Sequence, residues 1–206
     1  MRVAPSDASV TSARRALRAQ IRTQRRNVPP EHRALAARLV ARNIDRAFHL
    51  RPGQRIAVYA SLREELDTTP LIALARRRGC RIFLPRIIRR TGFIRFVESL
   101  AHGRASVNHL GIVEPQGSTS ISPRWLDLVL LPLVGFDARG MRLGMGGGFY
   151  DRTFAFRNIH TAWRRPRLVG VAYSFQQLPS IERQAHDVRL DAVITEKGVV
   201  RCRTGS

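Results

Sequence analysis

Asp127-Leu128-Val129-Leu130-Leu131-Pro132-Leu133-Val134 is the most apolar stretch of the chain. A continuous apolar run of this length is typical of a β-strand buried on both faces. Shorter runs of the same kind occur at 56–60, 81–84, 93–97, 168–173 and 192–194. Helical patterns alternate with these strands, at 12–26, 31–48, from Asp67 or Thr68 to Arg78, and 150–158. The alternation predicts an α/β fold, a three-layer α/β/α domain with a mostly parallel sheet.

The chain has 206 residues, enough for one compact domain. Residues 1–11 are small and polar, so we expect them to be disordered and Ser12 to cap the first helix. No composition break marks a linker, and residues 12–206 are therefore predicted to form a single domain. The stretch 100–123 is rich in Gly, Ser and Pro and predicts a long loop.

The composition favours anionic partners. The formal net charge is +21, and Lys197 is the only lysine among 36 basic residues. Such a charge favours a small molecule bearing phosphates, or a nucleic acid. Because the arginines are spread along the whole chain rather than gathered in a tail, we expect no obligate nucleic acid. A non-catalytic RNA- or polyanion-binding protein stays open as an alternative.

No apolar run reaches the roughly 18–20 residues of a membrane helix, so no membrane partner is expected. Cys80 and Cys202 form no CxxC pair, and the first residues lack the apolar core of a signal peptide. We therefore expect a cytoplasmic protein. We also expect a monomer.

A glycine-rich segment follows the 127–134 strand and leads into a helix. Gly144-Met145-Gly146-Gly147-Gly148 contains four glycines in five residues, and Arg142 and Arg152 flank it. Residues without side chains let main-chain N–H groups turn inward and bind an anion, and arginines match phosphate oxygens. The segment ends in Gly-Phe-Tyr, not the Gly-Lys-Ser/Thr of a Walker loop, and it lies too late in the chain for a dinucleotide fingerprint. A flexible surface loop is the other interpretation.

Five sequence blocks along the chain form one ordered set. The glycine block is Arg142-Leu143-Gly144-x-Gly146-Gly147-Gly148-Phe149-Tyr150-Asp151-Arg152, after Pro132-Leu133-Val134-Gly135-Phe136-Asp137. The other four are Tyr59 to Thr68, Leu84-Pro85-Arg86, Leu110-Gly111-Ile112-x-Glu114-Pro115, and His186-Asp187 with Asp191 to Glu196. In this order across residues 12–197, the five blocks together resemble the 5-formyltetrahydrofolate cyclo-ligase (5,10-methenyltetrahydrofolate synthetase) family.

The resemblance implies roles for individual residues. The implied ATP-binding residues are Arg14, Arg18, Arg142, Leu143, Gly144, Met145, Gly146, Gly147, Gly148, Phe149 and Tyr150. The implied substrate-binding residues are Ala60, Glu65, Met145, Gly146, Gly147, Gly148 and Phe149, and the implied Mg²⁺ ligands are Asp151 and Asp187. Two positions depart from the family pattern: Arg14 replaces a lysine and Phe149 replaces a tyrosine.

The resemblance implies an enzyme that converts 5-formyltetrahydrofolate, with or without a polyglutamate tail, to 5,10-methenyltetrahydrofolate, using ATP and Mg²⁺ and releasing ADP and phosphate. No side-chain nucleophile is expected. Taken alone, Glu65 and Asp187 fit polar turns, and Asp151 fits a helix cap. The competing enzyme interpretation is a phosphosugar- or CoA-handling protein of similar α/β architecture.

Overall fold

The computed structural model describes residues 7–101, 103, 105–107, 111, 113–159 and 165–202. The helices are α1 (Asp7–Arg26), α2 (Pro30–Phe48), α3 (Thr69–Arg77), α4 (Phe149–Phe154) and α5 (Phe156–Ile159), with short 3-10 helices at Pro123–Trp125 and Ser174–Gln176. The strands are β1 (Arg55–Ala57), β2 (Arg81–Ile88), β3 (Phe93–Glu98), β4 (Ala105–Val107), β5 (Val113–Pro115), β6 (Ser120–Ile121), β7 (Leu128–Pro132), β8 (Gly135–Phe136), β9 (Arg142–Leu143), β10 (Arg167–Val171), β11 (Ala192–Thr195) and β12 (Gly198–Arg201).

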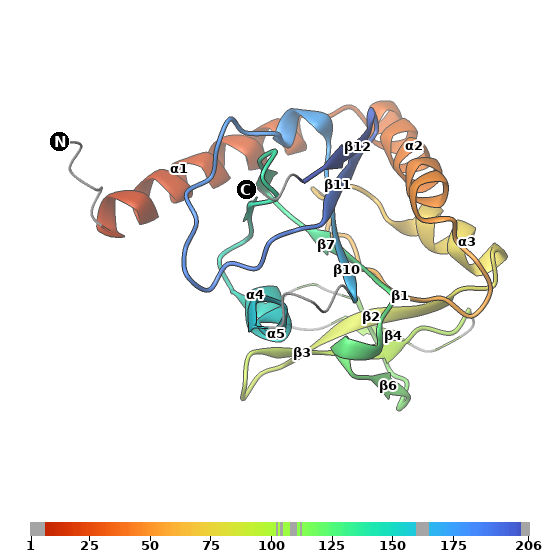
Figure 1. Ribbon diagram of the computed structural model, residues 1–206. Helices are drawn as coiled ribbons and strands as arrows, with labels where there is room; N and C mark the ends of the chain where they lie inside the picture. The colour runs from red at the N-terminus through yellow and green to blue at the C-terminus, as the bar shows by residue number, and fades with distance from the viewer. Residues whose placement is uncertain are drawn as a thin grey trace.

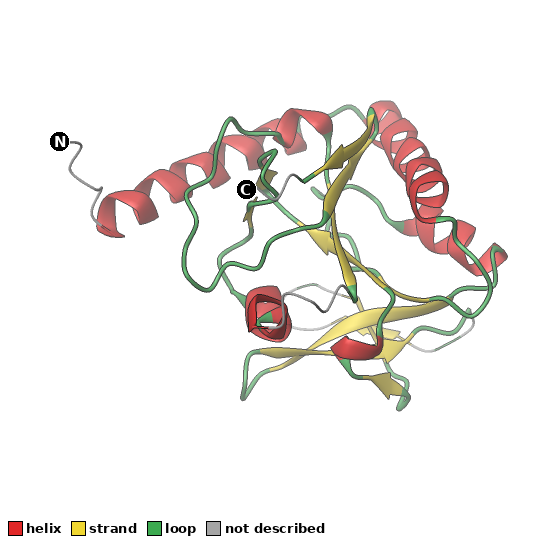
Figure 2. Cartoon of the chain, viewed as in Figure 1, coloured by secondary structure: helices red, strands yellow, loops and turns green. Residues whose placement is uncertain are grey.

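Eight of the described strands form one sheet in the order β12-β11-β10-β7-β1-β2-β3-β6. Figure 2 shows the strands in yellow, with helices in red around them. The five strands from β11 to β2 run parallel. Antiparallel strands complete both edges, β12 on one side and β3 with β6 on the other. The apolar strand β7 lies between β10 and β1, well inside the sheet, as its lack of polar residues predicts. The prediction of a mostly parallel sheet is confirmed.

Helices cover both faces of the sheet (Figure 1). The alternating residues of β7 show the two faces: Leu128 and Leu130 pack with α2 and α3, whereas Val129 and Leu131 pack with Phe154 of α4. The long helix α1 lies beyond the sheet's carboxyl edge, where Ile21 packs in a small cluster with residues 134, 141 and 143. The three-layer α/β/α prediction is therefore confirmed.

The start of the first helix was predicted wrongly. Helix α1 begins at Asp7 and not at Ser12, so part of the segment expected to be disordered is helical. No Gly or Pro interrupts residues 7–12, and the acidic Asp7 suits a helix N-terminus. Residues 1–6 lie outside the described part of the chain.

The strands also differ in extent from the sequence prediction. Strand β1 ends at Ala57, three residues early, and β2 continues to Ile88 because the antiparallel hairpin with β3 holds it through Pro85. Strand β12 was not predicted, and the 100–123 stretch contains β4, β5 and β6. Among the described helices, none combines the length and the hydropathy that a membrane span requires.

Candidate active site

A pocket of about 490 Å³ opens at the carboxyl ends of three neighbouring parallel strands. Tyr59 and Ala60 follow β1, Pro85 and Ile87 lie in the second half of β2, and Pro132 ends β7; all five line the pocket. In open α/β sheets ligands bind at this edge, because the loops that leave the strands enclose a crevice there. The sheet topology therefore places the pocket where a substrate site is expected.

The glycine loop, defined here as residues 144–148, forms one wall of the pocket. Gly146 and Gly148 have φ angles of +104° and +63°, which side-chain-bearing residues rarely adopt. Within the described residues, none of the loop's main-chain N–H groups donates a hydrogen bond. Unpaired amides at the wall of a pocket are available to an anionic ligand.

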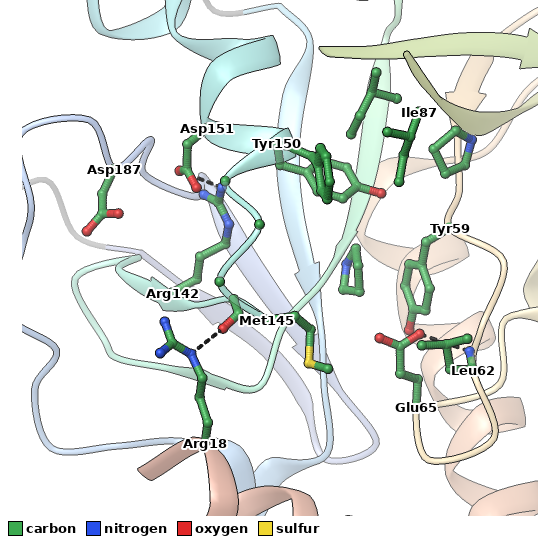
Figure 3. Close-up of a pocket in the computed structure, with 18 of the residues that line it drawn as sticks. Arg18, Tyr59, Leu62, Glu65, Ile87, Arg142, Met145, Tyr150, Asp151 and Asp187 are labelled. Carbon is green, nitrogen blue, oxygen red and sulfur yellow. Dashed lines mark hydrogen bonds and ion pairs between the residues drawn. The ribbon is translucent and has the colours of Figure 1, made fainter. Parts of the chain in front are cut away.

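Arg142 and Asp151 form a close ion pair at the two ends of the loop. Arg142 Nη2 lies 2.6 Å from Asp151 Oδ1, which also accepts a hydrogen bond from the Val188 N–H at 3.0 Å. Arg142 is only 8% exposed, yet it lines the pocket (Figure 3). Its charge is thus held in place before any ligand binds.

Helix α1 adds two arginines from the opposite end of the sequence. Arg14 and Arg18 are one helical turn apart and therefore share a face, which lines the pocket. Arg14 Nη2 lies 3.0 Å from Asp187 Oδ2, and Arg18 Nε donates to the Gly144 carbonyl at 2.8 Å. Burial, together with the charge of Arg14, lowers the pKa of Arg18. This face of α1 completes a cationic half of the pocket.

Asp151 and Asp187 each keep one carboxylate oxygen without a hydrogen bond among the described residues. Both hydrogen bonds to Asp151 end on Oδ1, and both to Asp187 end on Oδ2. The described residues contain no group of three or more Asp, Glu, His or Cys side chains that could hold a metal alone. A pair of carboxylates suits Mg²⁺ that is shared with phosphate oxygens, the usual arrangement in ATP-dependent enzymes.

The other half of the pocket is mainly apolar and contains Glu65. Tyr59, Leu62 and Ile87 surround this side, and Met145 lies between it and the cationic half (Figure 3). Glu65 Oε2 accepts a hydrogen bond from the Leu62 N–H at 3.0 Å, which closes a short turn. Burial raises the pKa of Glu65. One pocket thus offers positive charge at one end and a half-buried carboxyl group among apolar side chains at the other.

Comparison with known proteins identifies the family. A family model described as the 5-formyltetrahydrofolate cyclo-ligase family matches residues 10–196. The chain belongs to this family. The 5-formyltetrahydrofolate cyclo-ligase of Escherichia coli K12 is 34% identical over 182 residues, which cover 87% of this chain and 98% of that protein. The cyclo-ligase of Mus musculus is 28% identical over 195 residues, or 91% and 96% of the two chains.

Solved structures agree with the family assignment. The 5,10-methenyltetrahydrofolate synthetase of Aquifex aeolicus has a TM-score of 0.78 and 30% identity, with 94% of each chain covered. The synthetase of Mycoplasma pneumoniae has a TM-score of 0.70 and 25% identity, covering 89% of this chain and 98% of that one. The expected cyclo-ligase family and its fold are confirmed.

The cyclo-ligase pocket brings together all but one of the predicted site residues. Leu143 is the exception: its side chain is buried in the cluster around Ile21 and does not line the pocket. Leu143 belongs to strand β9, in which successive side chains point to opposite faces, so Arg142 beside it faces the pocket while Leu143 faces the core. The prediction that Leu143 binds ATP stays a prediction, and the buried side chain leaves only its main chain for that role.

Nine lining residues were not assigned an individual site role from the sequence, although several belong to the quoted blocks. They are Tyr59, Leu62, Pro85, Ile87, Ile94, Glu114, Pro132, Gln184 and His186. Most of them lie inside or beside the sequence blocks that carried the family resemblance, which was the available signal. Leu110 and Ile112 of one block lie outside the described residues. Arg152, expected to flank the phosphates, does not line the pocket.

The raised pKa of Glu65 makes a prediction about stability. Such a carboxyl group stabilises the fold fully only below its unfolded pKa of about 4.3, and this stabilisation is lost as pH rises through the folded pKa. Glu65→Gln removes the free-energy cost of ionising this half-buried carboxyl group in the folded protein. We therefore expect the variant to melt above the wild type at pH 7, with the gap closing toward pH 4 in thermal unfolding curves. A difference in melting temperature that stays constant between pH 7 and pH 4 would contradict a raised pKa for Glu65.

Proposed function

We propose that this chain is an ATP-dependent 5-formyltetrahydrofolate cyclo-ligase, which forms 5,10-methenyltetrahydrofolate, ADP and phosphate. The observation that carries the proposal is the two-ended pocket. Unpaired loop amides and three arginines lie at one end, and Glu65 lies among apolar side chains at the other. Such a pocket suits a triphosphate beside a flat, partly polar ring system, and the family assignment supports these two substrates.

The phosphates of ATP are assigned to the cationic half. The amides of the glycine loop would bind phosphate oxygens, with Arg14, Arg18 and Arg142 neutralising charge around them. Helix α4 has only six residues, so we assign this role to the loop amides and not to a helix dipole. Arginine at position 14 keeps the charge of the family's lysine and gains a planar fork, which here contacts Asp187.

Asp151 and Asp187 are assigned to Mg²⁺. Each carboxylate is held by an arginine through one oxygen. The second oxygen of Asp151 accepts no hydrogen bond among the described residues, and the second oxygen of Asp187 lies 3.9 Å from His186 Nε2, beyond hydrogen-bond distance. We assign these two oxygens to the ion. When bound together with ATP, Mg²⁺ neutralises phosphate charge and favours transfer of the γ-phosphoryl group.

The folate is assigned to the apolar half. Glu65 would hydrogen-bond the polar edge of the pterin ring, while Ala60, Met145 and Phe149 supply apolar contact surface. Phe149 has no hydroxyl but retains the aromatic face of the family's tyrosine. A glutamate or polyglutamate tail carries carboxylates, which this strongly basic protein attracts.

The reaction needs an activated formyl oxygen, because the oxygen of an amide is a poor leaving group. The formyl oxygen attacks the γ-phosphorus of ATP, an O–P bond forms, and the bond to ADP breaks. The N10 lone pair then adds to the formyl carbon, and N10 loses its proton to solvent. The C–O bond breaks with release of phosphate, and the cationic methenyl bridge between N5 and N10 remains. The lining contains no Ser, Thr, Cys or Lys among the described residues. The residues present position the reactants and neutralise charge, which is what phosphoryl transfer requires.

The test is direct turnover. The purified protein, 5-formyltetrahydrofolate, ATP and Mg²⁺ are expected to produce the absorbance of the conjugated methenyl product, with one ADP formed for each product molecule. Omitting ATP or adding EDTA is expected to abolish the signal, and excess Mg²⁺ to restore it after EDTA. Absorbance that does not exceed a protein-free control would remove the assignment.

A further inference from the structure

Arg152 is an exposed side chain that contacts the glycine loop from outside the pocket lining. It belongs to α4 and is not among the residues that line the pocket. Its Nη2 donates to the Gly147 carbonyl at 2.7 Å, and its Nε donates to the Gly92 carbonyl at 3.2 Å. Its guanidinium carbon also lies 5.3 Å from the centre of the Phe149 ring. One side chain thus connects the loop, the aromatic residue after it and the β2–β3 turn.

Two glycines leave the space that this guanidinium occupies. A Cβ at Gly92 would lie 2.7 Å from Arg152 Nη2, and a Cβ at Gly148 would lie 2.8 Å from Nη1. Both distances are shorter than real Cβ contacts, so a side chain at either position would displace the guanidinium. The φ angles of both glycines are also positive. The backbone of Gly92 on one side and of Gly148 on the other therefore leaves room for the Arg152 guanidinium.

The hydrogen bond to Gly147 sets the orientation of one peptide group in the loop. In a trans peptide the C=O and the following N–H point in opposite directions. Because the Gly147 carbonyl accepts this hydrogen bond, the Gly148 N–H points away from Arg152. Gly147 and Gly148 line the pocket, and Arg152 does not. A loop rich in glycine loses much conformational freedom when it is ordered, and a fixed peptide lowers that loss upon binding.

We propose that Arg152 is a positioning residue for the nucleotide: it holds the Gly147–Gly148 peptide so that the loop amides face the pocket before ATP arrives. The inference rests on the proposed function for the identity of the ligand. It goes beyond that function because it assigns ATP affinity to a side chain that does not touch the pocket.

Arg152→Met tests this role, since methionine retains much of the aliphatic stem and removes every donor. Without ligands, amide hydrogen exchange of a peptide spanning 144–149 is expected to be faster than in the wild type. The Kd for ATP with Mg²⁺ is expected to rise about 10-fold, the effect of losing one charge-assisted hydrogen bond. The KM for 5-formyltetrahydrofolate is expected to change less than the KM for ATP. Arg152→Lys, which restores one charged donor, is expected to recover part of the ATP affinity.

Arg95→Met is the matched control, because Arg95 is exposed on the neighbouring strand β3 and does not line the pocket. It is expected to match the wild type in loop exchange and ATP affinity. Unchanged exchange and unchanged ATP affinity in Arg152→Met would overturn the inference. So would equal losses of ATP and folate binding together with a lower melting temperature and no recovery in Arg152→Lys. The hydrogen-exchange measurement uses no substrate. It therefore tests whether Arg152 positions the loop even if the wild type forms no product and the proposed function fails.

Discussion

Gly147→Val is expected to lower ATP-dependent turnover at least about 100-fold while the sheet stays folded. A Cβ at position 147 would lie 2.5 Å from Cε2 and 2.8 Å from Cδ2 of the Phe149 ring. That ring cannot move aside easily, because Arg152 lies over it and the residues of the α4-side core pack against it. The loop itself must shift, and a displacement of about 1 Å at a site of this kind can reduce the rate about 100-fold.

The measurement is kcat/KM for ATP together with a far-ultraviolet circular dichroism spectrum. Gly103→Val provides the control for adding a valine to a loop glycine. Gly103 is exposed, does not line the pocket, and a Cβ there would meet its nearest neighbour at 3.4 Å, an ordinary contact distance. Activity of Gly147→Val equal to that of the control would show that the loop does not approach the phosphates.

Arg142→Gln is expected to lower kcat about 1000-fold, the smaller end of what an arginine contributes to phosphoryl transfer. Arg142 is held by Asp151 and by the Val188 carbonyl. Its guanidinium therefore does not have to move when negative charge develops on the phosphoryl group that is transferred. Glutamine is neutral and shorter. Asp151 would still accept the Val188 N–H, so the carboxylate has a remaining partner in the variant.

Arg139→Gln is the matched control, because Arg139 lies on the same β8–β9 hairpin but outside the pocket lining. Its partner Asp137 also accepts N–H groups from residues 139, 141 and 181, so that carboxylate stays satisfied when the guanidinium is removed. We expect near wild-type kcat for Arg139→Gln. The melting temperatures of both variants are measured together with the rates. A similar loss of kcat in both variants would indicate general destabilisation and would contradict the role of Arg142.

Local sequence features predicted most of this arrangement. The apolar run around Leu130 indicated a strand buried on both faces, and the structure confirms this strand inside the sheet. The glycine block after it indicated a ligand-binding loop. The loop lines the pocket, and its ligand stays a prediction. Ligands bind at the carboxyl ends of parallel strands in such sheets. This rule predicts that segments far apart in the chain meet in one pocket. Glu65 and Asp187 could be assigned only through the family resemblance, because each residue alone fits an ordinary turn.

Other features depend on contacts that a local pattern does not contain. Leu143 sits in a glycine-rich motif, but strand alternation turns its side chain into the core. The same motif predicted Arg152 near the phosphates. In the structure its guanidinium instead occupies the space left by Gly92, which is distant in sequence, and it does not line the pocket. Strand β2 passes through Pro85 because its antiparallel partner supports it. The roles of the site residues, the monomeric state and the cytoplasmic location stay predictions.

The ion pair between Arg14 and Asp187 joins two positions that are 173 residues apart. Protein synthesis proceeds from the N-terminus, so Arg14 is made long before the carboxylate that holds it. The cationic half therefore cannot close until synthesis has passed position 187. We expect a truncated chain that ends before this position to bind ATP more weakly than a chain that contains it.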